Sequence, residues 1–187
     1  AEDPETIGAF IAEPVMGAGG VIIPPDRYFE AVQRVLKKHS ILLIADEVIC
    51  GFGRTGNMWG SETYGLEPDI LTCAKALSSA YLPISAVLIS EDIIACMESQ
   101  ASELGIFGHG YTYSAHPVSA AVALRTLELM EERKIVEHVR SISNSFKERV
   151  TKLKKYDCVG DARAVGLIGA VEFVKEPGTR KKMDPKE

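Results

Sequence analysis

Two residues of opposite charge stand at the ends of apolar segments in this sequence. Asp46 closes the run over residues 41–45, and Lys75 closes the shorter run over residues 70–74. Apolar runs of this length, bounded by turn residues, indicate buried strands of a parallel sheet. Because open α/β sheets bind ligands outside the carboxyl ends of their strands, Asp46 and Lys75 are expected to converge on one crevice.

A carboxylate and a lysine in one crevice are the pair that pyridoxal phosphate chemistry requires. The lysine amine forms the Schiff base with the cofactor, and the carboxylate pairs with the pyridine nitrogen. An anion beside that nitrogen favours its protonated form, which withdraws electrons from the reacting carbon. Val48, two residues after Asp46, is placed to pack on the ring face. Taken singly, Asp46 is better explained as a turn cap and Lys75 as a solvated surface lysine.

The elements that position these residues alternate between strand and helix. A strand is predicted over residues 7–12, and a helix follows a glycine-rich loop and ends near Lys37 and Lys38. Alternation of this kind predicts an α/β protein with a mostly parallel sheet and flanking helices. The remaining predicted elements are a strand over 84–89, a helix over 91–99 capped by Ser90, a loop over 104–114, a helix over 117–133, a helical apolar stripe over 135–153 and a strand over 165–174.

The turn after Asp46 carries a pattern typical of another kind of site. Residues 51–56 match G-x-G-x-x-G, the fingerprint of dinucleotide-binding folds. That fingerprint opens a helix whose first amides bind pyrophosphate, whereas residues 57–60 start no helical pattern. The carboxylates of Asp46 and Glu47 would also oppose a pyrophosphate. An NAD(P)-binding oxidoreductase is therefore the disfavoured alternative from another class.

Composition argues against several other classes. The 187 residues hold 21 Lys and Arg against 26 Asp and Glu, without the basic patch of a nucleic-acid-binding protein. No apolar run approaches the roughly 18 residues of a membrane span, and no signal-peptide pattern is present. The four cysteines lack metal-binding spacing, and we expect reduced, mostly buried thiols in a cytoplasmic protein without a metal site.

Four segments carry a resemblance to a known family. Residues 45–56, 74–79 and 108–117 closely resemble the signature segments of class III pyridoxal-phosphate aminotransferases, and residues 13–20 resemble a fourth. The resemblance covers essentially the whole chain. It implies that residues 1–157 are part of a fold-type-I, pyridoxal-phosphate-binding large domain with connecting helices. Residues 158–187 would begin a small α/β C-terminal domain.

The resemblance also implies a role for each matching residue. Lys75 is the Schiff-base lysine, Asp46 the pyridinium partner and Val48 the ring-packing residue. Thr112 would bind the cofactor phosphate across the interface of a homodimer with a shared active site. Glu13 would lie near the substrate side of the site, although a structural ion pair explains it equally well.

The implied reaction is a ping-pong transfer of an amino group from an ω-amino acid or amine to a keto acid such as pyruvate. Residues 111–117 are similar to the ω-amino-acid or amine:pyruvate branch, and Ile49 stands where the ornithine- and aminobutyrate-type branches usually carry glutamine. A decarboxylating transaminase or an aminomutase would use the same lysine and aspartate.

Departures from the family concern glycines and length. Ala115, Ser78 and Ser79 stand where glycines are common, which would restrict the backbone near the cofactor. The family's catalytic chain is more than twice as long and supplies a phosphate cradle, a stacked aromatic residue and a substrate-binding arginine from elsewhere. We therefore expect a fragment that is inactive by itself, and a non-catalytic fragment remains a further alternative.

Overall fold

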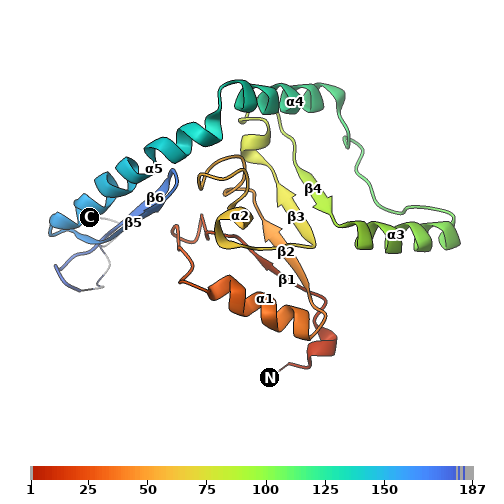
Figure 1. Cartoon of the computed structure of the whole chain (residues 1–187), viewed down its shortest axis with the longest axis horizontal. Coiled ribbons are helices and arrows are strands. Elements are labelled where there is room, and N and C mark those ends of the chain that lie inside the picture. Colours follow the sequence, from red (N-terminus) through yellow and green to blue (C-terminus); the bar gives the residue numbers. More distant parts are fainter. Residues whose placement is uncertain (1, 180, 182, 184–187) are drawn as a thin grey trace.

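A computed structural model describes residues 2–179, 181 and 183 of the chain. Its strands and helices alternate up to α3, two long helices follow, and the described part ends in a hairpin (Figure 1). The elements are η1 (Pro4–Thr6), β1 (Ala9–Ala12), α1 (Tyr28–Lys38), β2 (Leu42–Asp46), α2 (Gly60–Tyr64), β3 (Ile70–Cys73), η2 (Lys75–Leu77), β4 (Ala86–Ile89), α3 (Glu91–Leu104), α4 (Pro117–Glu132), α5 (Ile135–Thr151), η3 (Lys152–Lys155), β5 (Val159–Val165) and β6 (Ile168–Phe173).

A four-stranded sheet in the order β1-β2-β3-β4 forms the centre of the molecule. Strands β1, β2 and β3 are parallel, and β4 runs antiparallel to β3. The register places Ala12 beside Ala45 and Asp46 beside Thr72, so the carboxyl ends of the three parallel strands lie at one edge. The predicted α/β class, with a mostly parallel sheet and flanking helices, is confirmed.

Two apolar clusters cover the central strands. Phe29 and Leu36 of α1 pack with Leu43 of β2, whereas a second cluster joins Leu71 of β3 to Ala123 of α4. Successive side chains of a strand point to opposite faces, so packing on both faces requires apolar residues throughout. This explains why the runs that lead to Asp46 and Lys75 are continuous rather than alternating.

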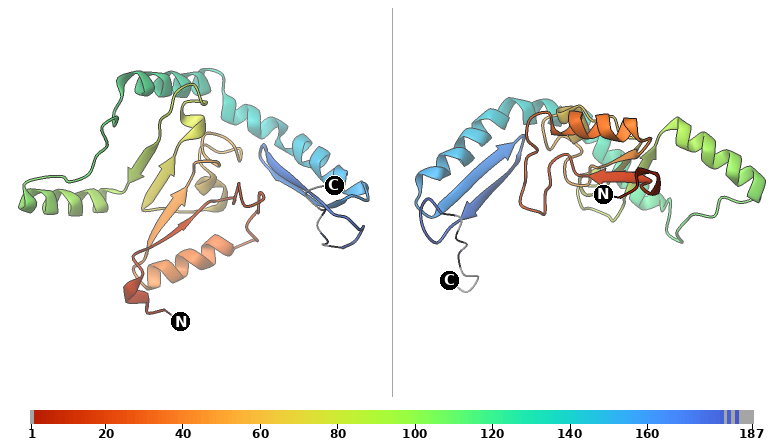
Figure 2. Two further views of the ribbon diagram at one scale, coloured as in Figure 1. Left: turned by 180° about the vertical axis from the view of Figure 1, so that it is seen from behind. Right: turned by 90° about the horizontal axis from the view of Figure 1, so that it is seen from below.

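The C-terminal part of the chain differs from the sequence prediction. The strand predicted over residues 165–174 is present as β6 over residues 168–173, but β5 was not predicted, and the chain reverses after β5 and pairs β6 antiparallel to it. Gly166 has φ 54°, and a Cβ there would lie 2.3 Å from the carbonyl oxygen of Arg54, so the turn requires glycine. The hairpin lies along α5 (Figure 2). The domain boundary between residues 157 and 158 stays a prediction.

Helix α3 and the cysteines also depart from expectation. The helix continues past residue 99 to Leu104 and ends at Gly105, whose φ is 71°; Ser90 stands at its N-cap without a side-chain capping bond. Helix α3 and the segment after it project away from the sheet (Figure 2). Cys50 and Cys73 are buried as expected, but Cys96 and Cys158 are exposed.

Two features are absent from the part of the chain that the structure describes. None of the described helices is long and apolar enough to span a bilayer. Among the same residues, no group of three or more His, Cys, Asp or Glu side chains is arranged to hold a metal ion.

Candidate active site

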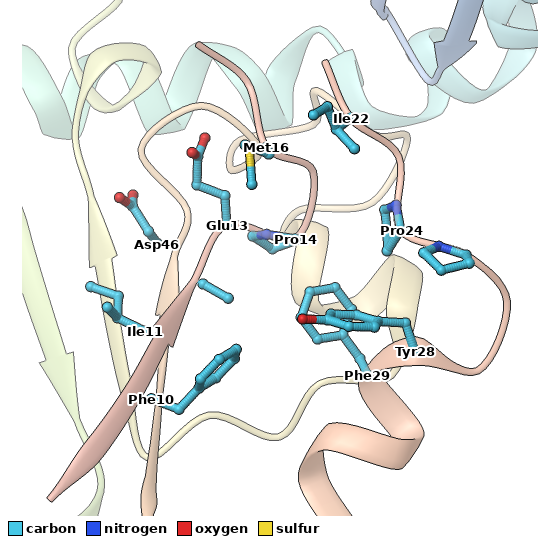
Figure 3. A pocket seen from close by; sticks show the side chains of 12 residues that line it. Phe10, Ile11, Glu13, Pro14, Met16, Ile22, Pro24, Tyr28, Phe29 and Asp46 are labelled. Atoms are coloured by element: carbon cyan, nitrogen blue, oxygen red, sulfur yellow. The ribbon is translucent and has the colours of Figure 1, made fainter. Parts of the chain in front are cut away.

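Two carboxylates mark the carboxyl edge of the sheet. Asp46 ends β2 and is half-buried, and its Oδ1 accepts a hydrogen bond of 3.0 Å from the backbone amide of Val48. Glu13 directly follows β1, whose register with β2 places it opposite Asp46. Both carboxylates line a cleft beside the strand ends and lie at the same end of it, away from the aromatic rings of Tyr28 and Phe29 (Figure 3). The edge of the sheet thus carries a concentrated negative charge.

Lys75 follows the end of the neighbouring strand. It is exposed and begins the one-turn helix η2, three residues after Thr72, the partner of Asp46 in the sheet. Its φ of 44° lies in the left-handed region, which costs a residue with a side chain about 1 kcal/mol. Hydrogen bonds from Leu77 to Ala74 (3.0 Å) and from Ser78 to Lys75 (3.3 Å) hold this turn. Retained strain at a strand end is a recurrent feature of functional sites.

The structure does not bring all the expected site residues together. Val48 lies in the turn after β2, half-buried and bonded through its amide to Asp46. Thr112 is exposed and lies in the segment between α3 and α4, and its assigned role across a dimer interface stays a prediction. Ser79 and Ala115 have φ of 50° and 55°, so two positions where the family commonly has glycine do adopt glycine-like backbone.

Glu47 is an important residue to which the sequence analysis gave no role. Its side chain is fully buried and accepts hydrogen bonds from the amide of Gly60 (2.8 Å), the amide of Ser61 (2.6 Å) and the hydroxyl of Ser61 (2.5 Å). These donors form the N-terminus of α2. The sequence contains one signal for this role. Successive side chains of an extended strand point to opposite faces, so Glu47 is expected to point away from Asp46.

The position of Glu47 also disfavours the dinucleotide alternative. The helix that follows Gly56 is α2, which is five residues long and begins only at Gly60. Its first amides already donate to the Glu47 carboxylate rather than pointing into an open anion site. The glycine pattern over residues 51–56 therefore lacks the helix terminus that a pyrophosphate needs.

A cleft of about 530 Å³ opens beside the strand ends (Figure 3). Its walls are mostly apolar, with Glu13 and Asp46 as the acidic groups, and it does not include Lys75. The lining residues are Phe10, Ile11, Ala12, Glu13, Pro14, Met16, Ile22, Pro24, Pro25, Tyr28, Phe29 and Asp46.

The buried thiols near the site are poor nucleophiles. Burial raises the pKa of Cys50 to about 11, and its Sγ lies 3.4 Å from the carbonyl oxygen of Val15, to which it donates. Burial also raises the pKa of the Cys73 thiol. Because the thiolate is the nucleophilic form, neither cysteine is suited to covalent catalysis near neutral pH. Lys75 remains the exposed nucleophile at this edge.

In this sheet a half-buried aspartate and an exposed lysine follow adjoining parallel strands, which is the arrangement that pyridoxal-phosphate-dependent transferases require. The model of the aminotransferase class-III family matches residues 1–185, and the chain belongs to this family. Pyridoxal phosphate is the cofactor of that family. The residues present fit it, because Asp46 offers an oriented carboxylate, Val48 an apolar side chain and Lys75 an accessible amine.

Comparison with known proteins agrees with this assignment. The chain is 56% identical over 172 residues to the chloroplastic gamma aminobutyrate transaminase 3 of Solanum lycopersicum, covering 92% of this chain and 33% of that protein. The omega transaminase of Pseudomonas jessenii in complex with PMP matches with a TM-score of 0.93 and 48% identity, covering 97% of this chain and 40% of the other. A transaminase solved with L-ala gives a TM-score of 0.94 and 52% identity, covering 97% and 43%. The chain thus spans about a third of the length of its curated relatives.

Proposed function

We propose that the protein containing this chain is a pyridoxal-phosphate aminotransferase that moves an amino group from an ω-amino acid or amine to a keto acid such as pyruvate. The observation that carries the proposal is the order of the sheet, in which Glu13, Asp46 and Lys75 end or follow three neighbouring parallel strands. Membership of the class III family supports it. Because the chain spans only part of its relatives, the proposal concerns the full-length protein.

Each residue at the edge has a distinct task in this proposal. When bound, the cofactor supplies an electron sink for the carbon that loses its proton. Asp46, oriented by the Val48 amide, would keep the ring nitrogen protonated, since a neighbouring anion favours the cationic form. Lys75 would hold the cofactor covalently until the amine of the substrate replaces it, and the freed Nζ would then accept the proton from the substrate carbon. Val48 would pack on the ring.

The class of amino donor rests on the relatives. Several are named for gamma-aminobutyrate, itself an ω-amino acid, and others are described as omega transaminases. Ile49 is therefore not taken to exclude γ-aminobutyrate as a donor. A panel of γ-aminobutyrate, β-alanine and 1-phenylethylamine with pyruvate as acceptor separates the possibilities, because transamination forms alanine with each accepted donor. Carbon dioxide release would identify a decarboxylating transaminase, and an isomerised donor without alanine would identify an aminomutase.

A shared site in a homodimer is part of the same proposal. Large apolar side chains near Thr112 are strongly exposed in this chain, with Leu104 at 74%, Phe107 at 55% and Tyr113 at 83%. A surface of this kind is typical of a protein interface. Thr112 on that surface would reach the cofactor phosphate of the partner's site. Sedimentation of the full-length protein tests this, and a monomer that binds the cofactor normally would contradict it.

A cytoplasmic location also remains a proposal. The relatives from Solanum lycopersicum and Oryza sativa are named as chloroplastic or mitochondrial. Fractionation of the source cells would decide between these compartments.

Chemical trapping tests the catalytic assignment directly. The full-length protein is incubated with pyridoxal phosphate, reduced with borohydride and mapped by peptide mass spectrometry, and the pyridoxyl label is expected on Lys75. Asp46→Asn should keep the label but lose most of the transfer rate, whereas the exposed control Asp92→Asn should behave like the parent. A label on another residue would overturn the role of Lys75. Absence of any label would favour a non-catalytic protein.

A further inference from the structure

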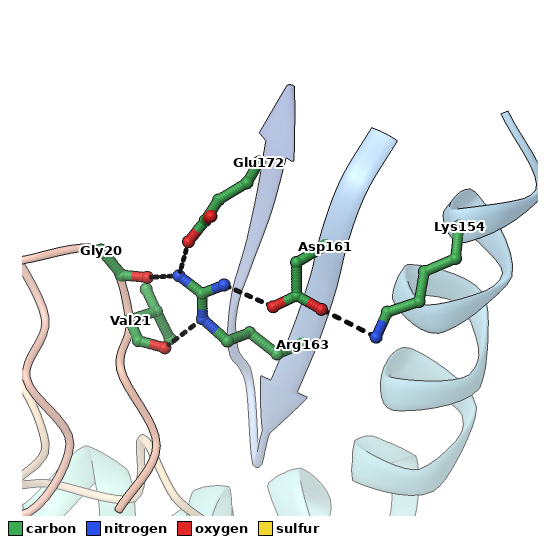
Figure 4. Close-up of polar contacts among 6 residues, drawn as sticks. All are labelled: Gly20, Val21, Lys154, Asp161, Arg163 and Glu172. Atoms are coloured by element: carbon green, nitrogen blue, oxygen red, sulfur yellow. Dashed lines mark hydrogen bonds and ion pairs between the residues drawn. The ribbon is translucent and has the colours of Figure 1, made fainter. Parts of the chain in front are cut away.

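Arg163 joins two parts of the chain that are far apart in sequence. It lies on β5, and its Nε donates a hydrogen bond of 2.8 Å to the carbonyl oxygen of Val21 (Figure 4). Its Nη2 donates to the carbonyl oxygen of Gly20. The side chain is only 18% exposed, so both bonds are largely shielded from water. A guanidinium therefore ties the hairpin to the loop over residues 16–22.

Hydrogen bonds inside that loop continue the connection to the site. The amides of Gly20 and Val21 donate to the carbonyl oxygen of Gly17 at 3.0 and 2.9 Å. The amide of Gly17 in turn donates to Glu13 Oε2 at 2.8 Å. A continuous chain of bonds thus leads from Arg163 to the carboxylate that stands opposite Asp46.

The same loop forms a wall of the cleft. Met16 and Ile22 pair through two backbone hydrogen bonds of 3.2 and 2.9 Å, and both side chains line the cleft together with Glu13. A Cβ on Gly17 would lie 2.4 Å from Cδ1 of Ile49, so the base of the loop is packed tightly on the turn after β2. Movement of the loop would therefore change both the wall of the cleft and the setting of Glu13.

The loop is held in a conformation that it would not adopt unaided. Val21 has φ 52°, which is a genuine outlier for a β-branched residue. Such strain persists only where surrounding contacts fix it. Val21 has a fixing contact on each side, its amide bonding Gly17 and its carbonyl bonding Arg163.

We propose that Arg163 is a positioning residue for the substrate side of the site, acting through residues 16–22 on Glu13 and on the cleft wall; this rests on the proposed function. Asp161 and Glu172 pair with the same guanidinium from the hairpin, and Lys154 pairs with Asp161 at 2.7 Å. These ion pairs hold the guanidinium in place within the hairpin. Its remaining donors reach the loop, so the position of the hairpin sets the shape of the cleft.

The test compares Arg163→Lys with Arg125→Lys in the full-length protein. Lysine keeps a cation for Asp161 and Glu172 but lacks the planar fork that reaches two carbonyl groups, so the hairpin should stay folded while the loop is released. Arg125 is a matched control, because it also binds two carboxylates, Glu128 and Glu132, but on an exposed face of α4.

Hydrogen exchange and steady-state kinetics are the two readouts. For Arg163→Lys, amide exchange over residues 17–22 should rise about tenfold or more, as one lost charge-assisted hydrogen bond implies. The KM for the amino donor should rise about tenfold with kcat within about threefold, the pattern of a lost binding contribution. The control should change neither quantity.

Two results would overturn the inference. Unchanged exchange over residues 17–22 would mean that Arg163 does not hold the loop. Faster exchange with an unchanged KM would mean that the loop does not position the substrate side. Pyridoxyl labelling of Lys75 is scored separately on the parent protein, so a failure of the proposed function is recognised independently of the exchange result.

Discussion

Replacement of Glu47 offers the sharpest test of how the site is supported. The carboxylate is fully buried and accepts three hydrogen bonds, at 2.8, 2.6 and 2.5 Å, from Gly60 and Ser61. In Glu47→Ala all three donors lose their acceptor in a site without solvent. Each buried donor left unpaired costs about 1–3 kcal/mol, so we expect a loss of about 4 kcal/mol in the free energy of unfolding.

Glu47→Gln refines the test, because it preserves size and removes only charge and one acceptor. The amide oxygen can still accept from Ser61, but the amide nitrogen then faces the backbone amide of Gly60, which predicts a loss of about 2 kcal/mol. Glu67→Gln is the matched control, since its ion pair with Lys37 is exposed to solvent and its loss should leave the free energy of unfolding nearly unchanged.

Denaturant titration of the three variants, followed by circular dichroism, measures these differences in the full-length protein. If Glu47→Gln unfolds at the same denaturant concentration as the parent, the buried carboxylate does not stabilise α2 as argued. The same holds if Glu67→Gln is destabilised as much as Glu47→Gln.

Three further predictions concern the hairpin and the thiols. Gly166→Ala should destabilise by about 3 kcal/mol in denaturant titration, because it adds a backbone clash to left-handed strain, whereas Gly65→Ala, with φ 63° and open space, should cost only about 1 kcal/mol. Iodoacetamide at pH 8 should modify Cys50 far more slowly than the exposed Cys158, since burial raises the pKa of Cys50 to about 11, and equal rates would contradict this. Hydrogen bonds from Lys154 and then Arg163 lower the pKa of Asp161, so its contribution to stability is present at neutral pH and is lost as pH falls through that lowered pKa. The difference in melting temperature between the parent and Asp161→Asn should therefore shrink below about pH 4.

The sequence was sufficient to predict the elements whose apolar pattern is set by packing on both faces. The runs before Asp46 and Lys75 became β2 and β3, and Pro117 became the first residue of α4. The hairpin could not be predicted in this way, because its turn at residues 166–167 lies inside the mostly apolar run over residues 165–174. What determines the reversal is the docking of Gly166 on the backbone of Arg54, a contact 112 residues away in sequence that no local pattern encodes.

The site was predictable to the extent that it depends on strand ends. Asp46 and Lys75 follow neighbouring parallel strands, so their placement at one edge follows from topology. The proposed role of Arg163 could not be predicted from the sequence. It depends on a contact with the carbonyl oxygen of Val21, which forms only when the two distant segments fold together. The role of Thr112 depends on a partner subunit and remains a prediction.

The glycine turn over residues 51–56 shows how a familiar pattern arises for a different physical reason. A Cβ on Gly51 would lie 2.9 Å from the carbonyl oxygen of Glu47, and Gly53 and Gly56 have φ of 93° and 97°. Leu167 of the hairpin donates to the Arg54 carbonyl at 2.9 Å, and Arg140 of α5 donates to the Gly56 carbonyl at 2.6 Å. The turn thus receives contacts from Glu47 directly after β2, from α5 and from the hairpin at once. Its glycines permit this close packing of backbones, so a turn that resembles a phosphate loop acts here as the junction through which the C-terminal elements are fixed to the strand that carries Asp46.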